Sequence, residues 1–287
     1  MPEAEIGIIG GTGLYEMEGF AESHSVVLET PFGDPSDAYV LGKLEGRNVA
    51  FLPRHGRGHR FMPHEINYRA NLYGFKKLGV KWLISMSAVG SLKEELRPTE
   101  VVIPDQFYDR TKTRKDTFFG DGIVAHVSFG DPVCKGLFRI LVEAGKEAGA
   151  VVHVGGTYVN MEGPAFSTRA ESNTYRKQGF DVIGMTNLTQ AKLAREAEMC
   201  YVTIAMVTDY DCWKRDAEEV SVETIVRVLQ QNAQMAQNIV KLAVTKIPPD
   251  QECECARALE TAILTRPEDI SEEVRQRLAP IIGKYLK

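Results

Sequence analysis

Two aspartates separated by one residue carry the strongest chemical signal in the chain. Asp209 and Asp211 follow an apolar segment, Cys200 to Val207, whose composition is typical of a buried strand. Residues two apart in a strand share a face, so both carboxylates can reach one ligand. A planar purine with an exocyclic amine fits such a pair, because a protonated carboxyl can donate to ring N7 while the other accepts from N6. The pattern predicts adenine recognition coupled to acid catalysis, and a solvated turn at the strand end is the alternative.

Basic residues follow a second apolar segment. Asn48–Leu52 is expected to be a strand, and Arg54 and His55 come shortly after it, before a glycine and further basic residues. The planar guanidinium matches phosphate with two parallel hydrogen bonds, and several cations in one loop favour an oxyanion site. A solvated basic loop is the alternative.

Small and polar residues end three more of the expected strands. Gly10-Gly11-Thr12-Gly13 follows the first apolar segment and can bring backbone amides close to an anion. It is neither a dinucleotide-binding fingerprint nor a Walker loop. Ser87 and Ala88 follow a later strand and offer a hydroxyl and amides, while Met185 and Thr186 offer an apolar surface for a sugar and a phosphate donor. Plain turns and core packing would produce the same residues.

The order of the expected elements indicates an α/β fold. Helical patterns cover Asn67–Leu78, Asp131–Ala148 and Ser221–Val244, and they alternate with the apolar segments 5–9, 39–44, 48–52, 82–86, 101–104, 151–158, 182–185 and 200–207. This alternation predicts a three-layer single domain over residues 1–245, with a central mixed twisted β-sheet flanked by helices and ligand groups at the strand ends. Pro248-Pro249 then interrupts the chain, and residues 246–287 are expected to form a helical extension, Cys253–Thr265 and Ser271–Leu286, packed on the same domain.

Charge and composition exclude several classes of protein. The chain has 34 basic and 39 acidic residues, a net charge of −5, and no long run of one sign, so neither a nucleic-acid groove nor a polybasic membrane anchor is expected. The N-terminus lacks a basic region, and its apolar run is too short for a signal or membrane segment. We therefore expect a cytoplasmic protein whose partner is a small molecule, with no nucleic acid and no membrane.

The five cysteines show no pair of CxxC motifs, so no metal is expected. Cys253 and Cys255 form a CxC motif, and cytoplasmic thiols are normally reduced. The alternative is a strained Cys253–Cys255 bridge together with a Cys134–Cys200 bridge, since intracellular proteins of hyperthermophiles are rich in disulfides.

Taken together, these motifs resemble those of the methylthioadenosine phosphorylases, within the larger family of purine nucleoside phosphorylases. The resemblance covers nearly the whole chain to about residue 245, and the motifs occur in the family's order: GGTGL, PRHGRGH, MPHEINYRAN, SAVGSL, DQFYDRT, EGPAFSTRAES, MT after the strand at Val182, and TDYDCW. It implies a nucleoside phosphorylase-like fold and the phosphorolysis of S-methyl-5′-thioadenosine to adenine and 5-methylthioribose 1-phosphate, a reaction of methionine and purine salvage. Inorganic phosphate would be the co-substrate, with no cofactor and no metal.

The resemblance also implies roles for individual residues. Asp209 and Asp211 would be catalytic, and Asp209 would relieve the negative charge that develops on the leaving adenine. Phosphate would be bound by residues from four strand ends: Thr12, Arg54, His55, Ser87, Ala88 and Thr186. The nucleoside would contact Met185, Phe166, Tyr210, Ser167, Val222, Ile225 and His126. The family's histidine at the position of His126 is lent by a neighbouring subunit, which implies a homotrimer or a dimer of trimers.

Three alternatives stay open. A purine nucleoside phosphorylase acting on adenosine, or on inosine, guanosine or methylthioinosine, shares the scaffold, although a carboxylate at position 209 matches a 6-oxopurine poorly. An NAD-dependent oxidoreductase would use the N-terminal glycine loop for pyrophosphate, and it needs a third glycine where Glu16 stands. A non-catalytic nucleotide-binding module would lack an intact acid or phosphate site.

Overall fold

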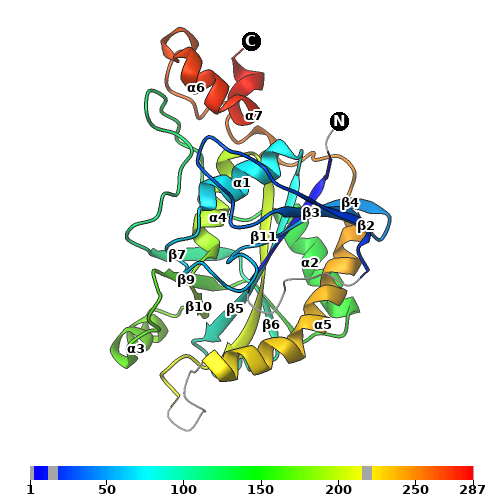
Figure 1. The fold of residues 1–287 in the computed structure, drawn as a ribbon. Helices are drawn as coiled ribbons and strands as arrows, with labels where there is room; N and C mark the ends of the chain where they lie inside the picture. The colour runs from blue at the N-terminus through cyan, green and yellow to red at the C-terminus, as the bar shows by residue number, and fades with distance from the viewer. Residues whose placement is uncertain (1–2, 12–18, 215–221, 287) are drawn as a thin grey trace.

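The sheet at the centre of the molecule contains eleven strands among the described residues (Figure 1). The computed structural model describes residues 3–11, 19–214 and 222–286, with only the backbone described at 222–226, 229 and 231. The strands are β1 (Ile6–Gly10), β2 (Ala21–Val26), β3 (Tyr39–Leu44), β4 (Arg47–Pro53), β5 (Trp82–Ser91), β6 (Val101–Ile103), β7 (Gln106–Arg110), β8 (Val152–Val154), β9 (Thr157–Met161), β10 (Val182–Gly184) and β11 (Cys200–Asp209).

Strand β5 lies at the centre of the sheet. The order is β2-β3-β4-β1-β5-β10-β9-β7, and β11 pairs with both β5 and β6, while β8 pairs with β6. Strands β1 and β11 run parallel to β5, and β10 runs antiparallel to it. The sheet is therefore mixed, as the sequence predicts.

Helices cover both faces of the sheet. They are α1 (Tyr68–Lys77), α2 (Lys135–Glu147), α3 (Arg169–Lys177), α4 (Asn187–Glu196), α5 (Val222–Lys246), α6 (Glu272–Arg277) and α7 (Ala279–Ile282), with 3₁₀ turns η1 (Glu254–Arg257), η2 (Pro267–Asp269) and η3 (Gly283–Tyr285). Helices α1 and α4 pack on one face, and α2 and α5 pack on the other. This arrangement confirms the predicted three-layer α/β fold.

Strand β11 is buried along its whole length, which explains why its sequence is mostly apolar. Tyr201 belongs to the core cluster on the α1 and α4 face, whereas Val202 and Ile204 belong to the cluster on the α2 and α5 face. A strand buried on both faces reads as a continuous apolar run instead of an alternating one. The length of β11 brings its last residue, Asp209, to the edge of the sheet.

The C-terminal segment packs against the same core, through residues such as Leu259, Leu278 and Ile282. Glu198, at the turn before β11, anchors it: Oε1 accepts from the Tyr285 hydroxyl at 2.5 Å and from the Leu259 amide at 3.1 Å, and Oε2 pairs with Lys284 Nζ at 2.6 Å. The expected helix over Cys253–Thr265 is wrong, because only η1 forms there. The domain boundary at residue 245 stays a prediction.

Other differences from the expected elements have local causes. The expected strand 151–158 is split into β8 and β9 by Gly155 and Gly156, both with positive φ. Helix α2 begins at Lys135 with Cys134 at the N-cap, not at Asp131.

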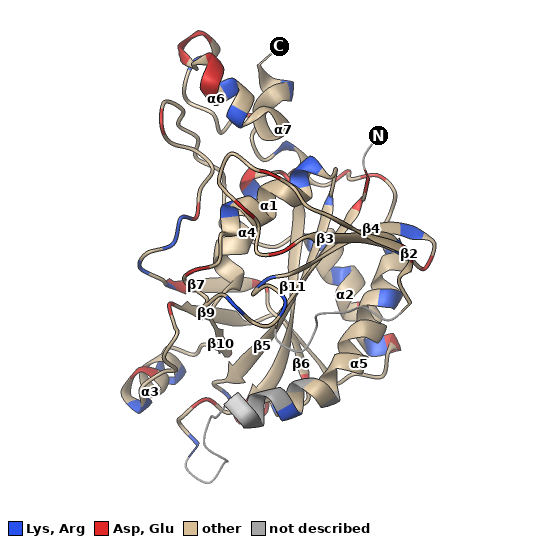
Figure 2. Ribbon diagram, viewed as in Figure 1, with Lys and Arg blue, Asp and Glu red and all other residues tan. Residues whose placement is uncertain are grey.

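Lysine, arginine, aspartate and glutamate lie mainly on the helices, the loops and the outer strands (Figure 2), and β1, β5 and β6 contain none of them. Within the part of the chain that the structure describes, none of the helices combines the length and apolarity needed to cross a bilayer.

Candidate functional site

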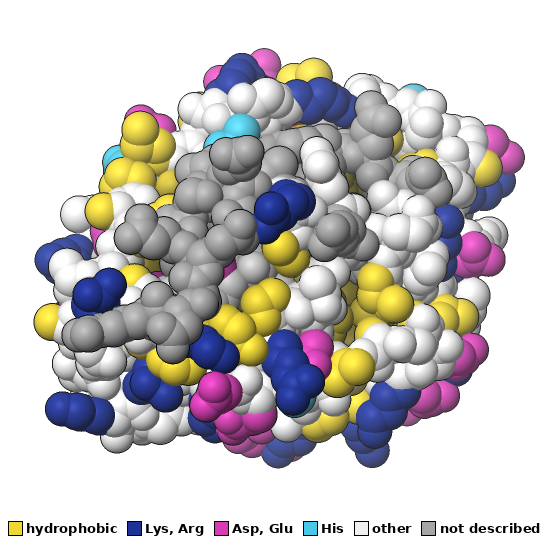
Figure 3. Space-filling model, turned by 90° about the horizontal axis from the view of Figure 1, so that it is seen from below, with side chains coloured by type: hydrophobic (Ala, Val, Ile, Leu, Met, Phe, Trp, Pro, Cys, Tyr) yellow, Lys and Arg dark blue, Asp and Glu magenta, His cyan; other side chains and the backbone are white. Residues whose placement is uncertain are grey.

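The carboxyl pair lies where β11 ends beside β5. The parallel register of the two strands slips after Val207 and places Asp209 opposite Gly90. A Cβ atom at position 90 would lie 3.0 Å from Asp209 Oδ1 and 3.3 Å from Asp211 Cβ, so the two carboxyl groups share the space above this glycine. Asp209 and Asp211 are 7% and 6% exposed. Figure 3 views the molecule from this end, where apolar side chains show between charged ones of both signs.

The two aspartates come together through a turn and not along one strand face. Asp211 has a φ of 50°, so the chain has left the strand at this point. The prediction that both carboxylates lie on one face of the same strand is therefore wrong. The Asp211 amide donates to Asp209 Oδ1 at 2.7 Å, and the Thr208 hydroxyl donates to Oδ2 at 2.7 Å. This hydrogen-bonded turn fixes the position of the Asp209 carboxyl.

Burial raises the pKa of both carboxyl groups. For Asp209, the hydrogen bonds from the Thr208 hydroxyl and from the Asp211 amide oppose the rise in pKa. Burial raises the pKa of Asp211 to about 6, the Ser172 hydroxyl opposes this, and the charge of Asp209 adds to it. Asp211 Oδ2 is buried and has no hydrogen-bond partner among the described residues. The pair can therefore hold a proton close to neutral pH.

Arg54 is buried at the end of β4, with 1% of its surface exposed. Its amide donates to the Gly10 carbonyl at 2.9 Å, which ties it to the end of β1. Nη1 donates to Ser85 Oγ at 3.0 Å, and Nη2 donates to the Met86 carbonyl. A Cβ atom at Gly11 would lie 2.7 Å from Nη2, so glycine is required where the N-terminal loop passes the guanidinium. Burying a cation is costly unless acceptors surround it, and β5 supplies two of them.

His55 is buried next to Arg54, and its Nδ1 lies 2.8 Å from the Phe61 carbonyl oxygen. Burial and, after it, the charge of Arg54 lower the pKa of His55 to about 3. The imidazole is therefore neutral at physiological pH, and the role of the His55 backbone amide in binding phosphate stays a prediction.

The remaining arginines of this loop do not join Arg54. Arg57 and Arg60 are exposed, and both pair with Asp37, at 3.0 Å and 3.8 Å. Arg57 and Arg60 therefore do not gather with Arg54 as expected, because both pair with Asp37, and the role of Arg54 in binding an oxyanion stays a prediction.

A buried glutamine supports Arg54, and the sequence analysis did not identify it. Gln190 in α4 is fully buried, and its Oε1 accepts from Arg54 Nη1 at 3.2 Å, from Ser85 Oγ at 3.0 Å and from the Tyr201 hydroxyl at 3.0 Å. These hydrogen bonds join β4, β5, α4 and β11.

Asn187, in the first turn of α4, extends the same network. Its Oδ1 accepts from Thr186 Oγ1 at 2.9 Å and from the Tyr158 hydroxyl at 3.2 Å. Its Nδ2 donates to Ser85 Oγ at 3.2 Å and to Thr203 Oγ1 at 2.5 Å. The network thus connects Thr186 to the residues that hold Arg54. Polar residues inside apolar stretches, such as Thr203, were the available signal for it.

Three further predicted phosphate ligands lie close to this network. Ser87 and Ala88 lie on β5, just after the carbonyl that binds Arg54, and the Ser87 hydroxyl is 3.4 Å from the Tyr158 hydroxyl. Thr186 is buried at the N-cap of α4, where the first backbone amides of a helix favour an anion. The structure therefore brings Arg54, Ser87, Ala88 and Thr186 to one place.

The turn before α3 lies beside the carboxyl pair. Met185 packs on Gly163, since a Cβ there would lie 2.7 Å from its sulfur. The Ser167 carbonyl accepts from the Cys212 thiol at 3.2 Å, which places this turn next to Asp211. Phe166 is 43% exposed and is not part of the core.

Tyr210 and His126 make other contacts. The Tyr210 ring packs on Trp213 at 5.7 Å, and its hydroxyl donates to the Glu94 carbonyl at 3.4 Å. His126 is exposed, and its amide donates to the Ala262 carbonyl at 2.9 Å. In Figure 1 the segment between β7 and α2, which carries His126, extends toward α6, away from the end at which β11 stops. Their roles in substrate binding stay predictions.

Three predicted residues cannot be placed as side chains. Thr12 lies outside the described residues, and Val222 and Ile225 lie in the first turns of α5, where only the backbone is described.

A cleft of about 640 Å³ opens between the segment after β5 and α3, lined by residues that include Lys93, Glu94, Asn173 and Arg176. Its lining contains none of the predicted site residues. This cleft is therefore a surface feature separate from the candidate site, which is defined by the side chains described above and their contacts.

Comparisons with known proteins show the family to which the chain belongs. The sequence profile of the phosphorylase superfamily matches residues 5–245, so the chain belongs to that superfamily. The S-methyl-5′-thioadenosine phosphorylase of Koribacter versatilis is 62% identical over 283 residues, which are 99% of this chain and 97% of that protein. The protein of the same name from Geobacter sulfurreducens is 58% identical over 285 residues, 99% of this chain and 100% of the relative. These identities place the chain among the S-methyl-5′-thioadenosine phosphorylases.

Solved structures show the same likeness. A crystal structure of a methylthioadenosine phosphorylase sourced from an Antarctic soil metagenomic library has a TM-score of 0.93 at 50% identity, covering 98% of this chain and 99% of that one. Methylthioadenosine phosphorylase from Schistosoma mansoni in complex with adenine has a TM-score of 0.85 at 32% identity, with 98% of both chains covered.

Proposed function

We propose that the chain catalyses the phosphorolysis of S-methyl-5′-thioadenosine to adenine and 5-methylthioribose 1-phosphate. The observation that carries the proposal is the convergence of two buried groups on β5. Arg54 donates to Met86, and the carboxyl pair lies over Gly90, about 13 Å further along an extended strand. This is the scale of a nucleoside with phosphate beside its sugar.

Phosphate is the weak nucleophile of the reaction, and the network around Arg54 positions it. Arg54 supplies the positive charge, and the Ser87 and Thr186 hydroxyls supply further donors. Holding phosphate beneath C1′ replaces a bimolecular encounter with an oriented one, and its charge stabilises the cation that forms on the sugar. His55 contributes its amide, since its imidazole is neutral. Inorganic phosphate is the co-substrate, and no cofactor is expected.

The carboxyl pair assists the departure of adenine. As the C1′–N9 bond breaks, its electron pair moves to adenine, a phosphate oxygen bonds to C1′, and N7 takes a proton or a strong hydrogen bond from Asp209. Acid assistance of this kind contributes about a hundredfold to ten-thousandfold. Asp211, with a pKa of about 6, shares the proton with Asp209 and accepts from N6.

The remaining contacts follow from the family. Met185 lies beneath the ribose, Phe166 stacks near the base, and Ser167 and Tyr210 contact the nucleoside, while Val222 and Ile225 form the apolar wall for the methylthio group. The exposed position of Phe166 supports this, since the core does not require it.

We further infer a homotrimer or a dimer of trimers in the cytoplasm. His126 is exposed on a segment directed away from the end of its own β11, which suits a residue lent to a neighbouring subunit. Five free cysteines suit a compartment that keeps thiols reduced. Substitution of His126 should then raise the Michaelis constant for methylthioadenosine, and an active monomer would contradict this placement.

The proposal is tested by phosphate-dependent release of free base from methylthioadenosine, adenosine and inosine, measured side by side. Adenine release fastest from methylthioadenosine supports it, and cleavage of inosine alone would favour a 6-oxopurine phosphorylase. Asp209→Ala should remove most of the turnover without unfolding the chain, and Asp209→Asn should shift preference toward 6-oxopurines. The surface substitution Asp34→Asn is the control and should leave turnover unchanged. Unchanged turnover in Asp209→Ala would rule out Asp209 as the acid.

A further inference from the structure

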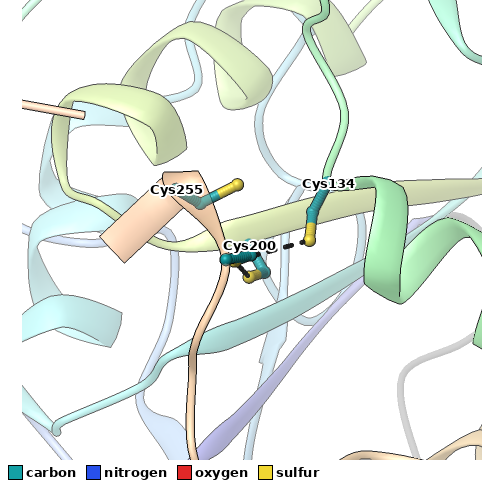
Figure 4. A group of neighbouring side chains, drawn as sticks. Cys134, Cys200 and Cys255 are labelled. Atoms are coloured by element: carbon teal, nitrogen blue, oxygen red, sulfur yellow. Dashed lines mark hydrogen bonds between the residues drawn. The ribbon is translucent and has the colours of Figure 1, made fainter. Parts of the chain in front are cut away.

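Four of the five cysteines gather in one place (Figure 4). Cys134 caps α2, Cys200 begins β11, and Cys253 and Cys255 belong to the start of η1. All four sulfur atoms lie within 4.8 Å of one another. The Cys200 and Cys253 sulfurs are 3.1 Å apart, and those of Cys134 and Cys253 are 3.8 Å apart. The cluster is at the opposite end of β11 from Asp209, about 30 Å along the strand.

These separations match the size of a tetrahedral metal site. Zinc binds thiolate sulfur at about 2.3 Å, and a regular tetrahedron of that radius has edges of about 3.8 Å. The two sulfur–sulfur separations of 3.1 and 3.8 Å and the upper limit of 4.8 Å bracket this value. Figure 4 shows the labelled side chains directed into a common space.

The surroundings of the cluster also favour a cation. Cys134, Cys200 and Cys255 are buried, and Cys253 is half-buried. A divalent cation would stabilise the four sulfurs together as thiolates in this largely buried space.

A side chain from outside the cluster donates a hydrogen bond to one of its sulfur atoms. Gln251 Nε2 donates to Cys200 Sγ at 3.3 Å and to the Glu198 carbonyl at 3.1 Å. Donors of this kind orient metal ligands and offset the charge of the sulfur.

The geometry points to a tetrathiolate site for one thiophilic divalent ion, Zn²⁺, whose ligands are Cys134, Cys200, Cys253 and Cys255. The expectation of no metal relied on the missing pair of CxxC motifs, whereas the ligands come from three segments far apart in the sequence. Four protein ligands close the coordination shell, so the ion is structural and not catalytic. It fixes the segment after Pro249 to β11 and α2, and its binding releases the thiol protons to solvent.

The test uses the full chain, purified under reducing conditions without chelator. Elemental analysis for zinc and iron, both of which thiolates bind, is expected to find about one ion per chain. Thiol titration of the denatured, unreduced protein in chelator should then detect all five cysteines. Absence of a stoichiometric ion overturns the proposal, as does a thiol count reduced by disulfide formation.

Matched serine variants assign the ligands. Cys255→Ser should lose most of the bound ion, whereas Cys212→Ser, which changes the one cysteine outside the cluster, should retain it. Retention in Cys255→Ser, or equal loss in both variants, overturns the assignment. If Cys255→Ser does not fold, the wild-type chain reconstituted with Co²⁺ tests whether thiolates bind the ion in tetrahedral geometry. Intense visible absorption typical of tetrahedral cobalt thiolates supports the site, and the weak spectrum of octahedral cobalt contradicts it.

Discussion

The Asp211→Asn variant is expected to be more stable than the wild-type chain at neutral pH, although it should lose activity. Asp211 is buried, and its Oδ2 accepts no hydrogen bond from the described residues. The ionised carboxylate is therefore poorly solvated in the folded chain. An asparagine amide has nearly the same shape and carries no charge, so it avoids this cost, while it removes the carboxyl that is proposed to share a proton with Asp209.

The size of the effect follows from the pKa of Asp211, which burial raises from 3.8 to about 6. Each pH unit corresponds to 1.36 kcal/mol, so ionising Asp211 costs the folded state about 3 kcal/mol. Because the folded pKa is above the unfolded one, the stability from this group is fully present below about pH 4 and is lost as pH rises through about 6. Asparagine does not titrate, so the variant should gain about 3 kcal/mol relative to wild type across this window.

Urea denaturation of both chains at about pH 4.5, 6 and 7.5 measures this difference. The Asp34→Asn control, at an exposed aspartate, should differ from wild type by less than about 0.5 kcal/mol at every pH. A difference between Asp211→Asn and wild type that is the same at all three pH values would refute the reasoning, because it would mean that the Asp211 carboxylate is not destabilised by burial.

Three further substitutions test other parts of the structure. Arg54→Lys removes the planar fork and should raise the Michaelis constant for phosphate about tenfold or more in the phosphorolysis assay; an unchanged constant would place the phosphate elsewhere. Gln190→Leu removes a buried acceptor shared by Arg54, Ser85 and Tyr201, although Arg54 Nη1 keeps Ser85 and the Tyr201 hydroxyl keeps Thr203. The variant should lower the free energy of unfolding by about 1–3 kcal/mol in urea titrations; an unchanged free energy of unfolding would mean that the network does not stabilise the fold. Glu198→Gln removes the buried charge that pairs with Lys284, so limited proteolysis should release the C-terminal segment earlier, and cleavage at the wild-type rate would contradict this anchor.

The sequence predicts those helices and strands whose apolar pattern can be recognised from neighbouring residues alone. The apolar run of β11 and the capped, periodic pattern of α1 are both recognisable without tertiary information. Helix α4 is different, because Asn187, Thr189 and Gln190 face the core and obscure its apolar stripe. Its polar residues are buried because they bind Arg54, Ser85 and Tyr158, and those contacts exist only in the folded chain.

Some residues of the candidate site can likewise be identified from the local sequence, and others cannot. Asp209 and Arg54 directly follow apolar strands, so their position in the sequence is sufficient to identify them. Gln190 is 136 residues from Arg54, and no local pattern connects the two. The left-handed turn at Asp211 is also invisible in the sequence, because aspartate adopts that conformation only where its surroundings stabilise it.

The hydrogen bonds that hold Arg54 would preorganise the proposed phosphate site. Ser85, Gln190 and the Met86 carbonyl orient the guanidinium during folding, so little dipole reorientation remains for the moment of reaction. A rigid arrangement of donors discriminates by shape as well as by charge. We therefore expect tetrahedral oxyanions such as arsenate and sulfate to compete with phosphate, and planar anions such as nitrate to compete poorly.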